Sequence, residues 1–175
     1  MEEKEGTEKP VNIAYIDAAN LDKGIKSNFG WKMDYRKFRI WLSEKYKVEK
    51  ALIFIGLISK YKDLYTRLQE CGFTLIFKDV IYQKGAPKGN CDSDLLMQAS
   101  CDLYEGNLSK AVIVTSDGDY APLIKVLKKK ERLEIILSPA PAKKCSILLK
   151  RTGAAIAYIN DQRAILEYKE ELARA

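Results

Sequence analysis

Short apolar runs alternate with amphipathic stretches along the chain. The runs are rich in Val, Ile and Tyr, whereas the stretches repeat their apolar residues with the period of a helix. Six runs are predicted as strands: residues 11–16, 50–58, 73–82, 110–116, 133–138 and 154–159. Six stretches are predicted as helices: residues 34–46, 59–72, 91–106, 120–130, 143–153 and 161–175.

This alternation is typical of an α/β fold. The strands are apolar almost throughout, which indicates a sheet that is covered on both faces. We therefore expect a three-layer α/β/α sandwich with a mostly parallel central sheet. Ser59 and Asp161 are predicted to cap helices, Gly72 to end one, and residues 83–90 to form a basic loop because they contain two glycines and a proline.

The length of 175 residues favours a single domain. We assign residues 11–175 to it and expect the polar, acidic residues 1–10 to be a disordered lead-in and not a signal peptide. No stretch approaches the roughly 18 consecutive apolar residues of a membrane span, and none of the four cysteines belongs to a C-x-x-C pair. We therefore expect a cytoplasmic protein with reduced thiols and no membrane partner.

Histidine is absent from the sequence. This excludes a Ser-His-Asp triad, a Cys-His nucleophile pair and a histidine acid/base couple. The net charge of +6 favours acidic partners, nucleic acid first. A lysine-rich surface that only keeps the protein in solution explains the charge equally well, so charge alone does not decide between the two.

Aspartates follow several of the predicted strands. In an open parallel sheet, ligands bind beyond the carboxyl ends of the strands, so these side chains are expected at one edge. The residues that this argument places there are Asp17 and Asn20, Asp92 and Asp94, and Ser116, Asp117 and Asp119. Taken singly, Asp92 and Asp119 could be helix caps, and Asp117 with Gly118 is an ordinary turn dipeptide.

A cluster of carboxylates needs neutralising. Two of them about 4 Å apart repel by roughly 4 kcal/mol at an effective dielectric constant of 20. Protons, water or a cation can relieve this repulsion, and oxygen-only ligands suit Mg²⁺ or Mn²⁺. An acidic pocket on a basic surface favours metal-assisted phosphodiester chemistry. Lys23, Lys84 and Lys88 are candidates to hold a nucleic-acid backbone, whereas the lysine run at 128–130 is more typical of a solvated helix face.

Three motifs resemble the NYN domain, in the LabA-like branch of the PIN-like metal-dependent ribonucleases. They are "YIDAANL", "KGNCDSDL" and "VTSDGDYAPLI", in the order of the family. The resemblance implies a PIN-like (Rossmannoid) fold, a divalent metal and RNA hydrolysis that leaves 5′-phosphate and 3′-hydroxyl ends. It carries over as site residues Asp17, Asn20, Asp92, Asp117 and Asp119, with Asp94 as a further acid.

Two positions depart from the pattern of the family. Tyr120 stands where phenylalanine is usual. Some LabA-like members carry another acid further along the helix that starts near Asp92, where this chain has Gln98, with Asp102 one turn later. The number of bound metals is therefore left open.

We predict an Mg²⁺- or Mn²⁺-dependent ribonuclease, of the endo or the exo type, that acts on single-stranded or structured RNA. Asp17, Asp92, Asp117 and Asp119 would bind the metal directly or through water, Asn20 would orient Asp17 or a phosphate oxygen, and Ser116 would support the metal shell. One alternative is a non-catalytic RNA-binding or scaffold domain of the same fold. A haloacid-dehalogenase-like phosphatase is disfavoured because "DAANL" lacks the second aspartate of its motif. A homodimer is compatible with the sequence.

Overall fold

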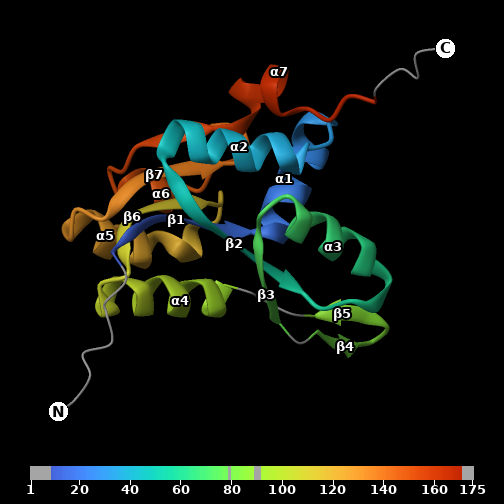
Figure 1. Cartoon of the computed structure of the whole chain (residues 1–175), viewed down its shortest axis with the longest axis horizontal. Helices are drawn as coiled ribbons and strands as arrows, with labels where there is room; N and C mark the ends of the chain where they lie inside the picture. Colours follow the sequence, from blue (N-terminus) through green and yellow to red (C-terminus); the bar gives the residue numbers. More distant parts are fainter. Residues whose placement is uncertain (1–8, 79, 89–91, 171–175) are drawn as a thin grey trace.

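Six parallel strands form the central layer of the structure, a computed structural model that describes residues 9–78, 80–88 and 92–170 (Figure 1). The strands lie in the order β3-β2-β1-β6-β7-β8, and each pairs in parallel with its neighbours. The predicted α/β class and parallel sheet are confirmed. The strands are β1 (Val11–Asp17), β2 (Val48–Gly56), β3 (Thr74–Lys78), β6 (Leu108–Val114), β7 (Leu133–Ser138) and β8 (Ile156–Tyr158).

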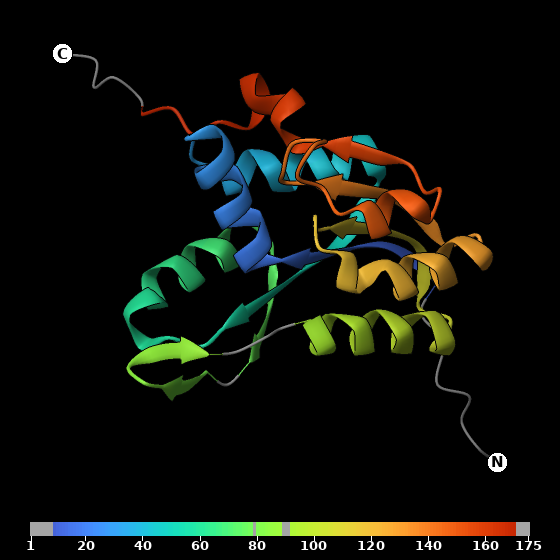
Figure 2. The same ribbon diagram turned by 180° about the vertical axis from the view of Figure 1, so that it is seen from behind.

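Helices cover both faces of the sheet (Figures 1 and 2). Buried side chains of α1 (Ala18–Phe29), α2 (Tyr35–Tyr46), α3 (Lys62–Glu70) and α7 (Arg163–Leu166) join one core cluster. Those of α4 (Asp92–Glu105), α5 (Ala121–Lys129) and α6 (Ile147–Arg151) join a second cluster on the other face. Successive strand residues point to opposite faces, so Ile16 belongs to the first cluster and Tyr15 to the second. Three 3₁₀ turns complete the elements of the described residues: η1 (Ser59–Tyr61), η2 (Gly118–Tyr120) and η3 (Ile159–Gln162).

The order of the strands reverses between β1 and β6. From β1 the chain runs outward through β2 to β3, and it then returns to the other side of β1 as β6. The helices that follow β1 and β6 consequently leave the sheet on opposite faces. This divergence opens a crevice outside the carboxyl ends of the two strands, where ligands bind in sheets of this kind.

A β-hairpin replaces part of the predicted third strand and the predicted loop. β3 ends at Lys78, and β4 (Ile81–Gln83) pairs antiparallel with β5 (Ala86–Lys88) outside the main sheet. Lys84 and Gly85 form the connection, with φ angles of 52° and 77°. Two consecutive positive φ angles are typical of a two-residue hairpin turn. The predicted loop was wrong because a residue pair that ends in glycine is typical of a two-residue hairpin turn as well as of a loop.

Helix α1 was not predicted, although Asp17 caps it by accepting a hydrogen bond from the backbone N–H of Asn20 at 3.0 Å. Two other predicted features are also different. The predicted cap Ser59 instead is the first residue of η1, whose cap position is occupied by Ile58. The helix predicted over residues 143–153 is confined to α6, because its cap is Ser146, which accepts from the N–H of Leu148.

The terminal helix predicted from Asp161 is much shorter than expected. Residues 159–162 are a 3₁₀ turn and α7 ends at Leu166. Beyond it the backbone is extended and pairs with residues 32–34, since the N–H of Tyr168 donates to the carbonyl of Lys32 and Leu166 accepts from Asp34. These bonds replace the helical ones. Residues 171–175 lie outside the described part of the chain.

The structure bears on two further expectations. No helix among the described residues is long and apolar enough to cross a membrane. Cys71, Cys101 and Cys145 are free thiols, and Cys91 lies outside the described residues. The predicted lead-in also falls largely outside them, since the described chain begins at residue 9.

Candidate metal centre

Asp17 ends β1 at the switch point and is buried, with only 7% of its surface exposed. Its Oδ1 accepts from the N–H of Asn20, and its Oδ2 lies 3.3 Å from the hydroxyl of Tyr120. Burial raises the pKa of the Asp17 carboxyl above its ordinary value, and the charges of Asp92 and Asp117 add to the rise against the two hydrogen bonds. Ionisation of a second carboxylate beside the first is therefore unfavourable in this site unless a cation enters.

The turn after β6 brings two more carboxylates to this edge. The hydroxyl of the buried Thr115 accepts from the N–H of Asp117 at 3.1 Å, and Oδ1 of Asp117 accepts from the N–H of Asp119 at 3.0 Å. Asp117 thereby caps η2, whereas the helix-capping role considered for Asp119 is not what the structure shows, since Tyr120 occupies the cap position of α5. The side chain of Asp119 is left exposed at the rim.

Gly118 allows this turn to pack against the start of α6. A Cβ atom at this position would overlap the Ser146 hydroxyl and touch the side chain of Leu148. The carbonyl of Ser116 accepts from the N–H of Ser146 at 3.1 Å, which holds the two segments together. The residue between the two aspartates is therefore a glycine for reasons of packing, because a side chain there would displace both carboxylates.

Asn20 connects the two strand ends. Its side-chain oxygen accepts from the backbone N–H of Ser116 at 2.8 Å and from the Ser116 hydroxyl at 2.9 Å. Its backbone N–H donates to Asp17. Asn20 thus ties the first turn of α1 to the turn after β6, and it sets the separation between Asp17 and Asp117.

The hydroxyl of Tyr120 contacts the carboxylates of both Asp17 and Asp92. Its side chain is fully buried, and its hydroxyl donates to Oδ1 of Asp92 at 2.7 Å. Burial, followed by the negative charge of Asp17 and the contacts with Asp92, raises the pKa of Tyr120 far above its ordinary value. The hydroxyl keeps its proton and acts as a fixed donor. Sequence reasoning missed this role, and the only signal was the departure from phenylalanine.

Asp92, Asp117 and Asp119 form the acidic group of the site. One oxygen atom from each of these carboxylates lies within 4.8 Å of the others. Ligand oxygens on opposite sides of Mg²⁺ are about 4.2 Å apart, at about 2.1 Å from the ion each. The separation in the group therefore suits direct ligation after a small movement, or ligation through water. A donor set of oxygens only fits Mg²⁺ or Mn²⁺.

The remaining predicted site residues are spread more widely. Asp94 is half-buried on α4 and is not a member of the acidic group. Two residues of an α-helix correspond to about 200°, so Asp92 and Asp94 face different directions. Lys23 on α1 is exposed beside the site. Lys84 is exposed in the turn of the hairpin, and the side chain of Lys88 lies outside the described ones.

Asp102 belongs to a different part of the molecule. Its carboxylate is buried where α4 packs on β1, and it accepts hydrogen bonds from Tyr15 at 2.8 Å and from Gln98 at 3.1 Å. The burial and the contact with Asp102 raise the pKa of Tyr15 far above its ordinary value. This pair of donors gives Asp102 a structural role, and it is absent from the acidic group of the described residues.

A cavity of about 790 Å³ connects the aspartates with the space between α1 and α3. Asp17, Asp92, Asp117 and Asp119 all line it. Its other walls come from the end of β2, from η1 and from α3, and Figures 1 and 2 show α1 and α3 on the same side of that strand. We call it the α1–α3 cavity. Residues that line it and that the sequence did not single out include Ile55, Ile58, Tyr61, Leu64 and Lys78.

Comparisons with known proteins agree with this architecture. A protein of unknown function from Vibrio parahaemolyticus has a similar structure, with a TM-score of 0.71 and 18% sequence identity over 91% of this chain and 98% of the other. At that identity the likeness concerns the fold alone. No curated protein matches the sequence. The profile of the NYN domain matches residues 12–158, which span all six strands of the sheet and all four aspartates. The chain therefore belongs to the NYN domain family.

Proposed function

We propose that this NYN domain is a ribonuclease that uses Mg²⁺ or Mn²⁺ to hydrolyse RNA phosphodiester bonds. The observation that carries the proposal is the convergence of four aspartates, from three separate segments, on one cavity at the switch point of the sheet. The family supports a PIN-like nuclease in general terms, and the three motifs favour its LabA-like branch.

The residues that would hold the metal are Asp92, Asp117 and Asp119, with the buried Asp17 beside them. When bound, the metal lowers the pKa of water and stabilises negative charge on a phosphate. Asp119 stands at the exposed rim and is the first carboxylate that an incoming cation would meet. Asp94 stays a prediction as a more distant ligand.

The protein itself contributes positioning. Tyr120 holds Asp92 through a partly buried hydrogen bond, and Asn20 fixes the distance between the two strand ends. Such outer contacts orient metal ligands before the metal arrives. The basic surface would attract the RNA backbone, and Lys23 is a predicted lysine whose described side chain lines the α1–α3 cavity.

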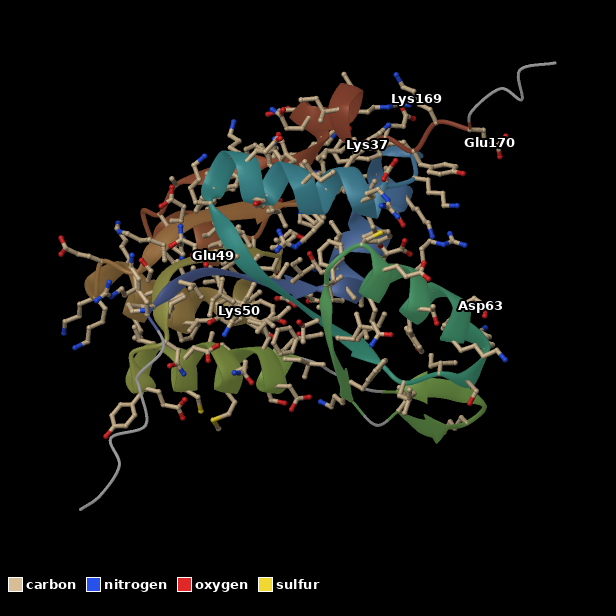
Figure 3. The ribbon with its side chains drawn as sticks, in the orientation of Figure 1. Lys37, Glu49, Lys50, Asp63, Lys169 and Glu170 are labelled. Atoms are coloured by element: carbon tan, nitrogen blue, oxygen red, sulfur yellow. The ribbon has the colours of Figure 1, made fainter. Side chains whose placement is uncertain are left out.

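Incubation of mixed RNAs with and without Mn²⁺ tests the proposal. We expect cleavage only with the metal, and products with 5′-phosphate and 3′-hydroxyl ends. Asp119→Asn should lower the rate by about 100-fold or more, beyond what loss of an outer contact usually costs. Asp63→Asn is the matched control, because Asp63 is an exposed aspartate on the outer side of α3 (Figure 3). Its rate should stay within about twofold of the wild type.

The outcomes separate the two functions considered. RNA binding without cleavage, in a protein that is stabilised by Mn²⁺, would favour a non-catalytic RNA-binding domain. Cleavage that survives both chelation and Asp119→Asn would refute the metal mechanism.

A further inference from the structure

The α1–α3 cavity is larger and more apolar than a metal site requires. A cation and its waters need only the carboxylate end, whereas the cavity has the size typical of a site for an organic ligand. Beyond the aspartates its walls are formed by Ile55, Ile58 and Leu64, with the ring of Tyr61 exposed on η1. An apolar chamber that adjoins a site for phosphate chemistry suits a ligand that has both an apolar part and a phosphate.

The far wall of the cavity is held in place by hydrogen bonds. The hydroxyl of the buried Tyr65 accepts from the N–H of Ile58 at 2.9 Å and donates to the carbonyl of Gly56 at 2.7 Å. Its ring meets that of Phe77 edge-on at 5.0 Å. The segment after β2 is thus anchored on α3 and β3. The chamber is preformed, which lowers the entropy cost of binding.

Gly56 brings the end of β2 close to the segment after β3. A Cβ atom at Gly56 would come within 2.7 Å of the side chain of Val80, which also lines the cavity. The glycine therefore allows Val80 to close this side of the chamber. Tyr61, by contrast, keeps 42% of its surface exposed although it lines the same cavity. Among the described aromatic side chains that line the cavity it is the most exposed, and the ammonium group of Lys60 lies over its ring, 4.8 Å from the centroid.

The chamber and the acidic group are close enough for one nucleotide to occupy both. Asp17 pairs in register with Phe54 on the neighbouring strand, about 4.8 Å away. Gly56 lies two residues further on, or about 6.6 Å along the strand. The end of β2 is therefore about 8 Å from the backbone of Asp17. A phosphate at the aspartates would place its own base in the chamber.

The charges around the cavity suit the same ligand. Lys23 on α1 and Lys78 at the end of β3 both line it. Among the described residues neither lysine makes an ion pair, whereas Lys26 nearby is paired with Asp22 at 2.9 Å. Uncommitted cations and an exposed aromatic ring on one cavity form the combination that binds single-stranded nucleic acid.

We propose that the α1–α3 cavity binds the base of the nucleotide next to the scissile phosphate, with Tyr61 as its aromatic contact. The inference rests on the proposed function, because it takes RNA as the substrate. A base inside a duplex is stacked and paired and must be extruded before it can enter such a chamber. The substrate is accordingly an unpaired strand, and a duplex is bound only through its backbone.

An abasic scan tests the inference. Binding of a short labelled uridine oligonucleotide is measured by fluorescence anisotropy in Ca²⁺, with each base removed in turn. In the wild type, removal of one particular base should weaken binding by about 5- to 150-fold, the range for one stacked base. In Tyr61→Ala the intact oligonucleotide should bind weaker by a similar factor. In Tyr61→Ala, removal of the same base should then weaken binding by less than about twofold, because the effects of two groups in contact are not additive.

Tyr104→Ala is the control, because Tyr104 is 93% exposed on α4 and does not line the cavity. It should behave as the wild type in every arm, and duplex RNA should bind all three proteins alike. Equal losses at that base in wild type and Tyr61→Ala, or no sensitive base, would overturn the inference. If RNA is cleaved but the effects of base removal and of Tyr61→Ala are independent, the base site alone is refuted. If the two effects are coupled but RNA is not cleaved, the nuclease activity alone is refuted. Absence of RNA binding refutes both proposals.

Discussion

Replacement of Asp17 by asparagine removes a charge from the candidate metal centre and keeps its hydrogen bonds. The asparagine oxygen can accept from the N–H of Asn20 as Oδ1 of Asp17 does. Asparagine is also as good a helix cap as aspartate. The new amide can donate to the Tyr120 hydroxyl, whose own proton goes to Asp92 at 2.7 Å. Asp17→Asn therefore isolates the electrostatic part of the site.

The size of the effect follows from the position of Tyr120. Its hydroxyl oxygen is 2.7 Å from Asp92 and 3.3 Å from Asp17, so the two carboxylate oxygens lie no more than about 6 Å apart. At that distance two unit charges repel by about 3 kcal/mol at an effective dielectric constant of 20. Water and salt at the open side reduce this value, so in chelator at pH 7 Asp17→Asn should stabilise the fold by about 1 to 2 kcal/mol. For a chain of this size that is a rise of about 2 to 8 °C in melting temperature.

The stability gained on Asp17→Asn should increase as the pH rises. Burial raises the pKa of Asp17 in the folded state, so the folded protein binds this proton more tightly than the unfolded chain and loses stability as pH rises. Below the unfolded pKa of about 3.9 the wild-type carboxyl is neutral in both states. Wild type and variant should then be equally stable below about pH 4, diverge as the pH rises from there through the raised pKa, and differ by a constant amount above it.

Thermal and urea unfolding in chelator between pH 4 and 8 measures both effects, with Asp63→Asn as the control for loss of an exposed charge. Saturating Mn²⁺ should reverse the order, because a ligand at 100 times its Kd stabilises the wild type by about 2.7 kcal/mol and the variant by less. A variant that is less stable than the wild type in chelator, or that shows the same pH slope, would contradict the reasoning.

Three further predictions concern other parts of the site. Tyr120→Phe removes the donor to Asp92 and should weaken Mn²⁺ binding by about 10- to 100-fold in a calorimetric titration; unchanged affinity would show that the hydroxyl does not position this ligand. Gly118→Ala forces a Cβ against Ser146 and should cost about 1 to 3 kcal/mol in urea unfolding, whereas a neutral result would mean that the turn can move. RNA affinity in Ca²⁺ should fall with log salt at a slope of about −0.7 per phosphate contacted, and a slope near zero would argue against the backbone as a partner.

The carboxylate edge was predictable from the sequence because parallel strands place all their carboxyl ends on one side. Asp17 and the turn at Asp117 come directly after apolar runs, so their common edge follows from the alternation of strands and helices. Asp94 shows the limit of this reasoning. It shares the first turn of α4 with Asp92, but helical rotation separates the two side chains, and only Asp92 joins the acidic group.

Elements stabilised mainly by tertiary contacts were not predictable. The sequence of α1 contains Gly24 and several polar residues, and the helix is held by the burial of Leu21 and Ile25 on the sheet. The shortened C-terminal helix likewise depends on backbone pairing with distant residues.

The contact of Tyr120 with Asp92 and the lining of the α1–α3 cavity were revealed only by the tertiary structure. The Tyr120 hydroxyl reaches Asp92 because η2 and α4 pack on the same face of the sheet, 28 residues apart in the chain. Tyr61 of η1 and Lys78 at the end of β3 lie on one cavity because α3 and β3 fold back beside β2. A periodic pattern determines which face of an element is buried and where the element ends. Which side chains from distant elements then meet depends on strand order and helix packing, and those are decided by the energy of the whole core.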